Sequence, residues 1–259
     1  MNLIEREDLQ FGRKGVAGRA VSGLLMGLLG IGKVNRLYAR TLTSGEPAAR
    51  TILSDLQITA DVAGNDNIPA TGGVIVVANH PTGALDGILL IDILTKVRPD
   101  VKFMGNFLLD KIESMKQYFI AVDPFDSADM RKNVHGVRES LAHVAAGGLL
   151  VIFPAGEVAT WRKGFGRLRD KRWNPSVMRT IRRAGVPVVP LYINARNSTL
   201  FHLAGKIHPM LRTALLPHEL FNKRGRRIAV TVGTPLTARK AEELGDLKTY
   251  GDFLRANVE

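Results

Sequence analysis

The feature that most constrains the fold of this chain is a set of short, wholly apolar segments that each end in a polar turn. They cover residues 74–78 (VIVVA), 149–153 (LLVIF) and 186–193 (VPVVPLYI). Segments this short and this rich in valine and isoleucine are typical of strands buried on both faces of a parallel sheet. Stretches with helical periodicity, at 127–146 and 175–184, lie between them. The alternation predicts an α/β domain with a largely parallel central sheet flanked by helices.

The rest of the main domain follows the same alternation. We expect further strands over 56–62, 102–105 and 119–122, helices over 85–94 and near 109–117, and a last strand that ends at Val232. In sheets of this kind, functional side chains lie in the loops at the carboxyl ends of the strands. Two such loops stand out by their polar residues and glycines, at 79–86 and 154–162.

Residues 1–50 predict a helical segment of a different kind. An apolar stripe runs from Leu24 to Ile31 between basic residues, and Ser44–Pro47 interrupts the helical pattern. The uncharged stretch 21–32 has 12 residues, fewer than the ~20 that span a bilayer. Such a segment suits a membrane interface, although a helix docked on the main domain shows the same pattern. The predicted division is a membrane-interface segment at 1–50 and a main domain at 51–259.

The net charge of +12 is concentrated in one part of the chain. Residues 161–227, the basic segment, hold 16 of the 36 lysines and arginines but only two of the 24 acidic residues, Asp170 and Glu219. This predicts an anionic partner. Only Trp161, Phe165 and Trp173 interleave with the densest basic run, whereas proteins that bind single-stranded nucleic acids stack bases on aromatic side chains. We therefore favour an anionic membrane surface over nucleic acid.

The chain contains no cysteine. Disulfides, cysteine-ligated zinc, iron–sulfur clusters and an acyl-enzyme on a thiol are therefore excluded. The sequence also lacks the G-x-S-x-G elbow of serine hydrolases, the G-x-x-x-x-G-K-[ST] phosphate loop and the H-E-x-x-H zinc motif. Its six histidines show no metal-ligand spacing, so we expect neither a metal nor a cofactor.

One pair of residues in the first polar loop has the composition of an acid–base site. His80 follows the segment 74–78, and Asp86 lies six positions later, beyond Pro81 and Gly83. A carboxylate that accepts a hydrogen bond from one imidazole nitrogen fixes the tautomer, so the other nitrogen can take a proton from a hydroxyl. A structural role, with His80 as a cap and Asp86 as a helix-start carboxylate, fits the same spacing.

Three blocks of the sequence carry a resemblance to a known family. Residues 79–87 (NHPTGALDG), 153–157 (FPAGE) and 186–190 (VPVVP) resemble the ordered N-H-x4-D, F-P-E-G-T-R/S and V-P-[IV]-[IV]-P blocks of the PlsC-type glycerolipid acyltransferases. The resemblance covers about residues 56–235. With the ARNS sequence at 195–198, it is nearest to the branch of hemolysin-like proteins and ornithine-lipid acyltransferases.

The resemblance implies an O-acyltransferase. Its donor would be an acyl thioester of acyl carrier protein or coenzyme A, and its acceptor the hydroxyl of a lyso-ornithine lipid, another aminolipid or a lysophospholipid. His80 would be the general base and Asp86 its orienting partner, with direct attack and no acyl-enzyme. Substrate contacts would come from the two polar loops and two arginines, namely Asn79, Thr82, Gly83, Phe153, Pro154, Ala155, Gly156, Glu157, Arg131 and Arg162. Because the first residues do not resemble a secretory signal, we expect a peripheral protein on the cytoplasmic face of the bacterial inner membrane.

The sequence departs from the family pattern in three places. Five residues instead of four separate His80 from Asp86, Ala155 replaces the glutamate of the second block, and Asp123–Pro124 stand where an arginine holds a glycerol phosphate, the nearest base being Arg131. These changes favour an acceptor other than lysophosphatidate. Two alternatives stay open, a basic nucleic-acid-binding protein and a non-catalytic lipid-binding homologue.

Overall fold

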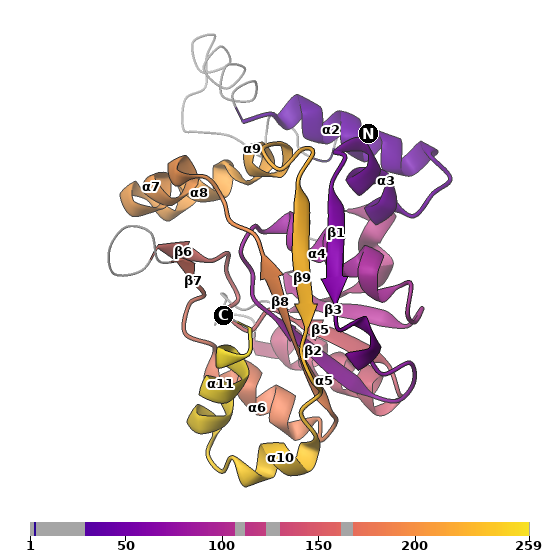
Figure 1. Ribbon diagram of the computed structural model, residues 1–259, viewed down its shortest axis with the longest axis vertical. Helices are drawn as coiled ribbons and strands as arrows, with labels where there is room; N and C mark the ends of the chain where they lie inside the picture. The colour runs from indigo at the N-terminus through magenta and orange to yellow at the C-terminus, as the bar shows by residue number, and fades with distance from the viewer. Residues whose placement is uncertain (1–2, 4–28, 107–111, 123–129, 162–167, 259) are drawn as a thin grey trace. The chain divides into compact units, whose positions relative to one another are not determined.

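The computed structural model describes residues 3, 29–106, 112–122, 130–161 and 168–258 (Figure 1). The chain divides into two compact units, one made of residues 1–59 and 197–226 and the other of residues 60–196 and 227–259. Each unit is described separately. The predicted division of the chain after residue 50 stays a prediction.

A seven-stranded sheet forms the centre of the second unit. Its order is β1 (Thr59–Ala63), β9 (Arg227–Val232), β8 (Val188–Asn194), β2 (Val74–Ala78), β5 (Leu149–Ile152), β3 (Val101–Asn106) and β4 (Phe119–Val122). The strands from β8 to β4 are parallel, and β9 pairs antiparallel with β8. The predicted, largely parallel sheet is confirmed. β2 is central, and all five of its residues are buried, which explains why its sequence is apolar without alternation.

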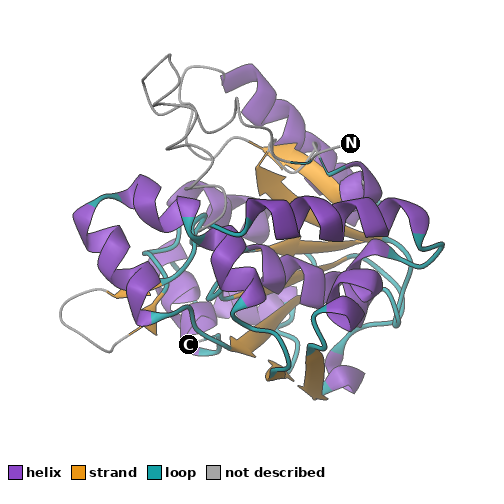
Figure 2. Ribbon diagram, turned by 90° about the horizontal axis from the view of Figure 1, so that it is seen from above, coloured by secondary structure: helices purple, strands orange, loops and turns teal. Residues whose placement is uncertain are grey.

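Helices cover both faces of this sheet (Figure 2). They are α4 (Ala84–Leu94), α5 (Met130–Ala145), α6 (Pro175–Arg183), α10 (Ala238–Glu243) and α11 (Leu247–Ala256). On one face, Ile75 and Val77 belong to a core cluster with Ile181 of α6 and Tyr250 of α11. α4 connects β2 to β3 and α5 connects β4 to β5, and these two crossovers run in opposite directions across the sheet. Because such crossovers are right-handed, α4 covers the face of the sheet opposite to α5.

Two predicted elements are wrong in type or extent. The helix expected near 109–117 is a 3₁₀-helix, η4 (Glu113–Tyr118), with residues 107–111 outside the described part. The strand expected over 56–62 begins only at Thr59, because Gln57 has a φ of 53° that breaks an extended backbone. Further short elements are η2 (Asn65–Asn67) and the antiparallel pair β6 (Thr160–Trp161) and β7 (Leu168–Arg169).

The first unit is helical, with α2 (Ile31–Thr43), α3 (Ala48–Asp55), α7 (Thr199–Ile207), α8 (Pro209–Ala214) and α9 (Leu216–Phe221). The predicted break at Ser44–Pro47 is confirmed between α2 and α3. Most of the apolar stripe, including Leu24, lies outside the described residues. Within the described ranges, none of the helices combines the length and hydrophobicity that crossing a bilayer requires.

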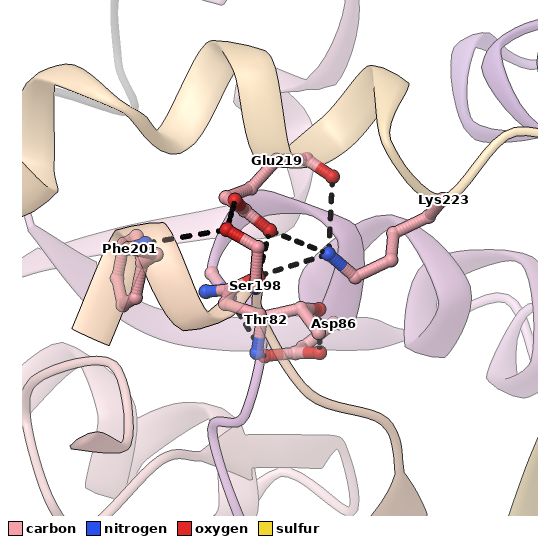
Figure 3. Close-up of polar contacts among 8 residues, drawn as sticks. Thr82, Asp86, Ser198, Phe201, Glu219 and Lys223 are labelled. Carbon is pink, nitrogen blue, oxygen red and sulfur yellow. Dashed lines mark hydrogen bonds and ion pairs between the residues drawn. The ribbon is translucent and has the colours of Figure 1, made fainter. Parts of the chain in front are cut away.

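A buried polar cluster joins α7 to α9 in the first unit (Figure 3). The Ser198 hydroxyl caps α7 and donates to Glu219, whose side chain is 1% exposed. Lys223 Nζ donates to Glu219 Oε2 at 2.9 Å and to Asn197 Oδ1 at 3.1 Å. Burial opposes ionisation of Glu219, but these hydrogen bonds hold its pKa below the usual value. The cluster therefore fixes the ends of both helices with a charged pair that is fully hydrogen-bonded.

We expect acid to weaken this unit through His202, which is 2% exposed in the same region. Burial lowers the pKa of His202, although the charge of Glu219 favours the imidazolium; Arg212 and Lys223 add to the lowering. The folded state thus holds a neutral ring, while the unfolded chain binds a proton below about pH 6.5. Stability should therefore fall as the pH drops below about 6.5, with a slope of up to about 1.4 kcal/mol per pH unit.

Urea unfolding between pH 7.5 and 5.5 tests this expectation. The slope should be shallower in His202→Asn and unchanged in His135→Asn, which alters an exposed histidine of α5. Equal slopes in the wild type and His202→Asn would contradict the assignment.

Gly136 allows α5 to lie directly against β4. A Cβ there would stand 2.2 Å from the Ala121 carbonyl oxygen and 2.7 Å from Val122 Cγ1. Alanine normally stabilises a helix by about 1 kcal/mol over glycine, but we expect Gly136→Ala to lower the unfolding free energy by about 1–3 kcal/mol through overpacking. Gly251→Ala on α11 is the matched control, because its Cβ would make ordinary contacts with Met178. Urea denaturation of both variants gives the comparison, and a Gly136→Ala variant as stable as Gly251→Ala would refute the packing argument.

Candidate active site

The first polar loop leaves the carboxyl end of β2, the central parallel strand of the second unit. Its first residue, Asn79, is 8% exposed, and its side chain makes two hydrogen bonds to β8. The Asn79 amide donates to the Ile193 carbonyl at 2.9 Å, and the Ile193 N–H donates to Asn79 Oδ1 at 2.7 Å. The side chain thus continues the β2–β8 ladder by one step. This pairing sets where the next residue, His80, leaves the sheet.

Asp86 lies within ion-pair distance of His80. Nδ1 of His80 is 3.0 Å from Oδ2 of Asp86, whose side chain is fully buried. The ring N–H is not aligned as a hydrogen bond in this conformation. Hydrogen bonds between catalytic side chains are often poorly aligned until a substrate binds. Because Nδ1 is buried and the side chain is 19% exposed, the accessible part of the ring lies away from Asp86.

Backbone and hydroxyl donors hold the Asp86 carboxylate in place (Figure 3). The N–H groups of Thr82 and Gly83 donate to Oδ2 at 2.8 and 2.9 Å, and the Thr82 hydroxyl donates to Oδ1. Asp86 lies in the first turn of α4, where the helix dipole favours a negative charge. These contacts fix the orientation of the carboxylate in its buried position.

Gly83 accommodates the extra residue between His80 and Asp86. Its φ of 90° and ψ of −127° form a conformation that is strained for any residue with a Cβ. The chain turns sharply there, so that α4 begins at Ala84 and Asp86 points back toward the loop. The five-residue spacing therefore still brings the two side chains together.

His80 is held from three further directions. Its ring stacks on the Phe153 ring, with 4.3 Å between centroids. The backbone N–H of His80 donates to Asp170 Oδ1 at 3.3 Å, and its backbone carbonyl accepts from the Ala159 N–H at 2.7 Å. Asp170 and Ala159 are contacts that the sequence reasoning missed. The available signal was the isolation of Asp170, one of only two acidic residues in the basic segment.

Phe153, which directly precedes the second polar loop, contacts His80, and the predicted residues of that loop make local contacts. The Gly156 N–H donates to the Phe153 carbonyl at 3.0 Å, and the Pro154 carbonyl accepts from Asn174 at 3.2 Å. Ala155 is buried in the core cluster, and Glu157 pairs with Lys171 at 3.8 Å. The Gly156 N–H is therefore engaged within its own turn in this conformation.

The two predicted arginines are not placed at the site. Arg131 lies on α5, where only its backbone is described, and Arg162 lies outside the described residues, as does Asp123–Pro124. In the described ranges, no three histidine, aspartate or glutamate side chains gather closely enough to hold a metal ion.

Comparison with known proteins agrees with this architecture. The sequence model of the acyltransferase family matches residues 46–258. The lyso-glycine lipid O-acyltransferase of Phocaeicola vulgatus is 27% identical over 209 aligned residues, covering 77% of this chain and 72% of that protein. The protein of the same name from Bacteroides thetaiotaomicron is 26% identical over 190 aligned residues, covering 70% of this chain and 67% of that protein.

A solved structure shows the same fold. The 1-acyl-sn-glycerophosphate acyltransferase PlsC of Thermotoga maritima matches with a TM-score of 0.50 at 18% identity, over 93% of this chain and 94% of that one. The family model includes the whole seven-stranded sheet and both polar loops. The chain therefore belongs to the acyltransferase family whose model it matches.

Proposed function

We propose that this enzyme transfers a fatty acyl group from an acyl thioester to the hydroxyl of a lyso-aminolipid. The observation that carries the proposal is the 3.0 Å contact between His80 Nδ1 and the buried carboxylate of Asp86. Asp86 would hold the imidazole with its proton on Nδ1, which leaves Nε2 to accept a proton from the acceptor hydroxyl. The stacked Phe153 ring and the Asp170 contact to the His80 backbone keep the base in position.

The reaction would proceed by direct attack. As the acceptor O–H gives its proton to His80 Nε2, its oxygen forms an ester bond to the thioester carbonyl carbon. The C–S bond then breaks, and the imidazolium returns the proton to the leaving thiolate. Asp86 stabilises the transient imidazolium. The absence of cysteine is consistent with this route, because no enzyme thiol carries the acyl group.

Three observations support an aminolipid acceptor over lysophosphatidate. Both curated relatives carry the name lyso-glycine lipid O-acyltransferase. Asp123–Pro124 stand where the family pattern has an arginine that holds a glycerol phosphate, and Ala155 replaces the glutamate of the second block. Ala155 is also buried, so it offers no polar contact to a headgroup.

The charge of the basic segment supports the proposed donor and location. Both acidic residues of the basic segment are buried, Asp170 at 2% and Glu219 at 1% exposure, so the exposed charge of that segment is cationic. An acidic acyl carrier protein and an anionic bilayer surface both suit such a surface. We propose carrier-bound acyl donors and a peripheral position on the cytoplasmic face of the inner membrane.

The test is acyl transfer to a matched panel of acceptors. Lyso-glycine lipid, lyso-ornithine lipid and lysophosphatidate, with equal acyl chains, are each offered with acyl carrier protein or coenzyme A thioesters of one chain length. We expect ester formation on the amino-acid lipids, and faster transfer from the carrier protein. Turnover of lysophosphatidate alone would contradict the proposed acceptor, and no transfer from any donor would contradict the activity.

A further inference from the structure

The α7–α8 hairpin of the first unit exposes an unusual number of apolar side chains. Of eight large apolar side chains that are exposed in the described part of the chain, five lie on these two helices. They are Leu200 (57% exposed), Leu203 (39%), Ile207 (79%), Met210 (62%) and Leu211 (42%). The other three, Leu42, Val134 and Phe253, lie singly on α2, α5 and α11. A cluster of this kind marks an interaction surface, whereas single exposed residues do not.

α7 carries apolar side chains on its exposed side as well as on its buried side. Phe201 and Ala204 are buried, while Leu200, Leu203 and Ile207 follow at helical spacing on the outer face. A helix that only packs on its own domain has a polar outer face. The outer face of α7 therefore has a contact to make beyond its unit's own core.

The hairpin is anchored, so this face has a fixed position within its unit. A Cβ on Gly205 of α7 would stand 2.9 Å from Arg212 Cδ of α8, which shows how closely the two helices pack (Figure 1). His208 Nδ1 caps α8 by accepting from the Met210 N–H. The N-terminus of α7 is tied to α9 through Ser198 and Glu219.

The charge around this face indicates which partner it fits. Residues 198–218 contain no aspartate or glutamate, and Glu219 is buried. Lys206 is exposed beside the apolar side chains. Exposed apolar side chains beside a lysine, in a stretch without acidic residues, suit the interface of a bilayer with anionic lipids, where the apolar groups enter the acyl region and the lysine meets phosphates.

We propose that the α7–α8 hairpin is a membrane-insertion element, which places Leu200, Leu203, Ile207, Met210 and Leu211 in the interfacial layer of an anionic bilayer. The inference rests on the proposed function only for its choice of lipid as partner. It assigns membrane contact to a surface far along the chain from the predicted N-terminal segment at 1–50.

Vesicle binding by the full-length protein tests the hairpin. In sedimentation with phosphatidylglycerol–phosphatidylcholine vesicles, Leu200→Ser/Ile207→Ser should reduce the partition coefficient about ten-fold or more. Val134→Ser/Phe253→Ser, a matched pair of exposed apolar residues on α5 and α11, should leave it within about two-fold. Equal binding by wild type and Leu200→Ser/Ile207→Ser would overturn the proposal.

A second measurement reports insertion directly. In Ile207→Trp, lipids brominated on the acyl chain should quench the added fluorescence, beyond the background from Trp161 and Trp173 in the wild type. No added quenching would overturn the proposal. A blue-shifted emission of the tryptophan added in Ile207→Trp, seen in the lipid-free protein, would also overturn it, because another part of the chain would then cover this face. So would a wild-type dimer that Leu200→Ser/Ile207→Ser dissociates, because a second copy would then cover it.

Acyl transfer in detergent micelles separates this inference from the proposed function. We expect Leu200→Ser/Ile207→Ser to retain wild-type turnover on micellar substrate while losing vesicle binding. A protein that binds vesicles through the hairpin but transfers no acyl group would sustain the insertion element and refute the activity. Loss of micellar turnover in parallel with vesicle binding, together with no added quenching in Ile207→Trp, would overturn the insertion element.

Discussion

Replacement of His80 by alanine is expected to lower kcat/KM for acyl transfer by roughly 10²–10⁴-fold, the range that a general base contributes. Without the imidazole, the acceptor hydroxyl has no group to take its proton as it attacks the thioester carbonyl. The fold should persist, because the β2–β8 anchor at Asn79 and the donors to Asp86 do not involve the His80 ring. Initial rates at saturating donor, with urea unfolding as a check on stability, measure the effect.

Two controls sharpen this result. His135→Ala removes an exposed histidine of α5 and should leave kcat/KM unchanged. Incubation of the wild type with the acyl donor alone should leave the protein mass unchanged, because the proposed attack is direct. Equal product from the wild type and His80→Ala would refute the general-base role, and a covalent acyl adduct would refute direct transfer.

Asp86→Asn should reduce kcat/KM by roughly 10²–10⁴-fold while largely preserving the fold. The asparagine oxygen can still accept from the Thr82 and Gly83 N–H groups, and its NH₂ group can donate to the Thr82 hydroxyl, which also accepts. What disappears is the negative charge that stabilises the imidazolium. The variant therefore separates the electrostatic role of Asp86 from its role as the cap of α4.

Asp86→Ala is the informative comparison. It removes the acceptor for three buried donors, so we expect a similar loss of activity together with about 1–3 kcal/mol of unfolding free energy for each donor left unsatisfied. Circular dichroism and urea midpoints should thus show that Asp86→Ala is less stable than Asp86→Asn, while the kcat/KM values of the two variants should be similar. Near-wild-type turnover by Asp86→Asn would show that the carboxylate is structural, the alternative that its position at the helix start also allows.

The central sheet could be predicted from the sequence because strands buried on both faces are apolar at every position. β2 and β5 are apolar at every position. By contrast, the pattern near 109–117 predicts a helix but not its type, because a short stretch of mixed polarity does not distinguish an α-helix from the 3₁₀-helix η4. The helices α7 to α11 were not anticipated. For α7 the pattern is obscured because this helix is apolar on its exposed face as well as its buried one.

The His80–Asp86 pair could be expected because the two residues lie on one loop, where six positions of chain and a glycine turn suffice to bring them together. That Asp86 is fully buried and accepts three hydrogen bonds depends on how α4 packs against the sheet. Asp170 is a clearer case, because its contact with the His80 backbone joins residues 90 positions apart.

The amino-acid sequence by itself determined the α/β class, the strand that precedes His80 and the location of the excess positive charge, because these depend on local residue type and spacing. Only the tertiary structure decided what the two acidic residues of the basic segment do. Both are buried: Asp170 accepts a hydrogen bond from the His80 backbone N–H, and Glu219 of α9 accepts hydrogen bonds from Ser198 at the start of α7. Burial and long-range pairing are properties of packed elements, and no spacing along the chain specifies which distant residues will meet.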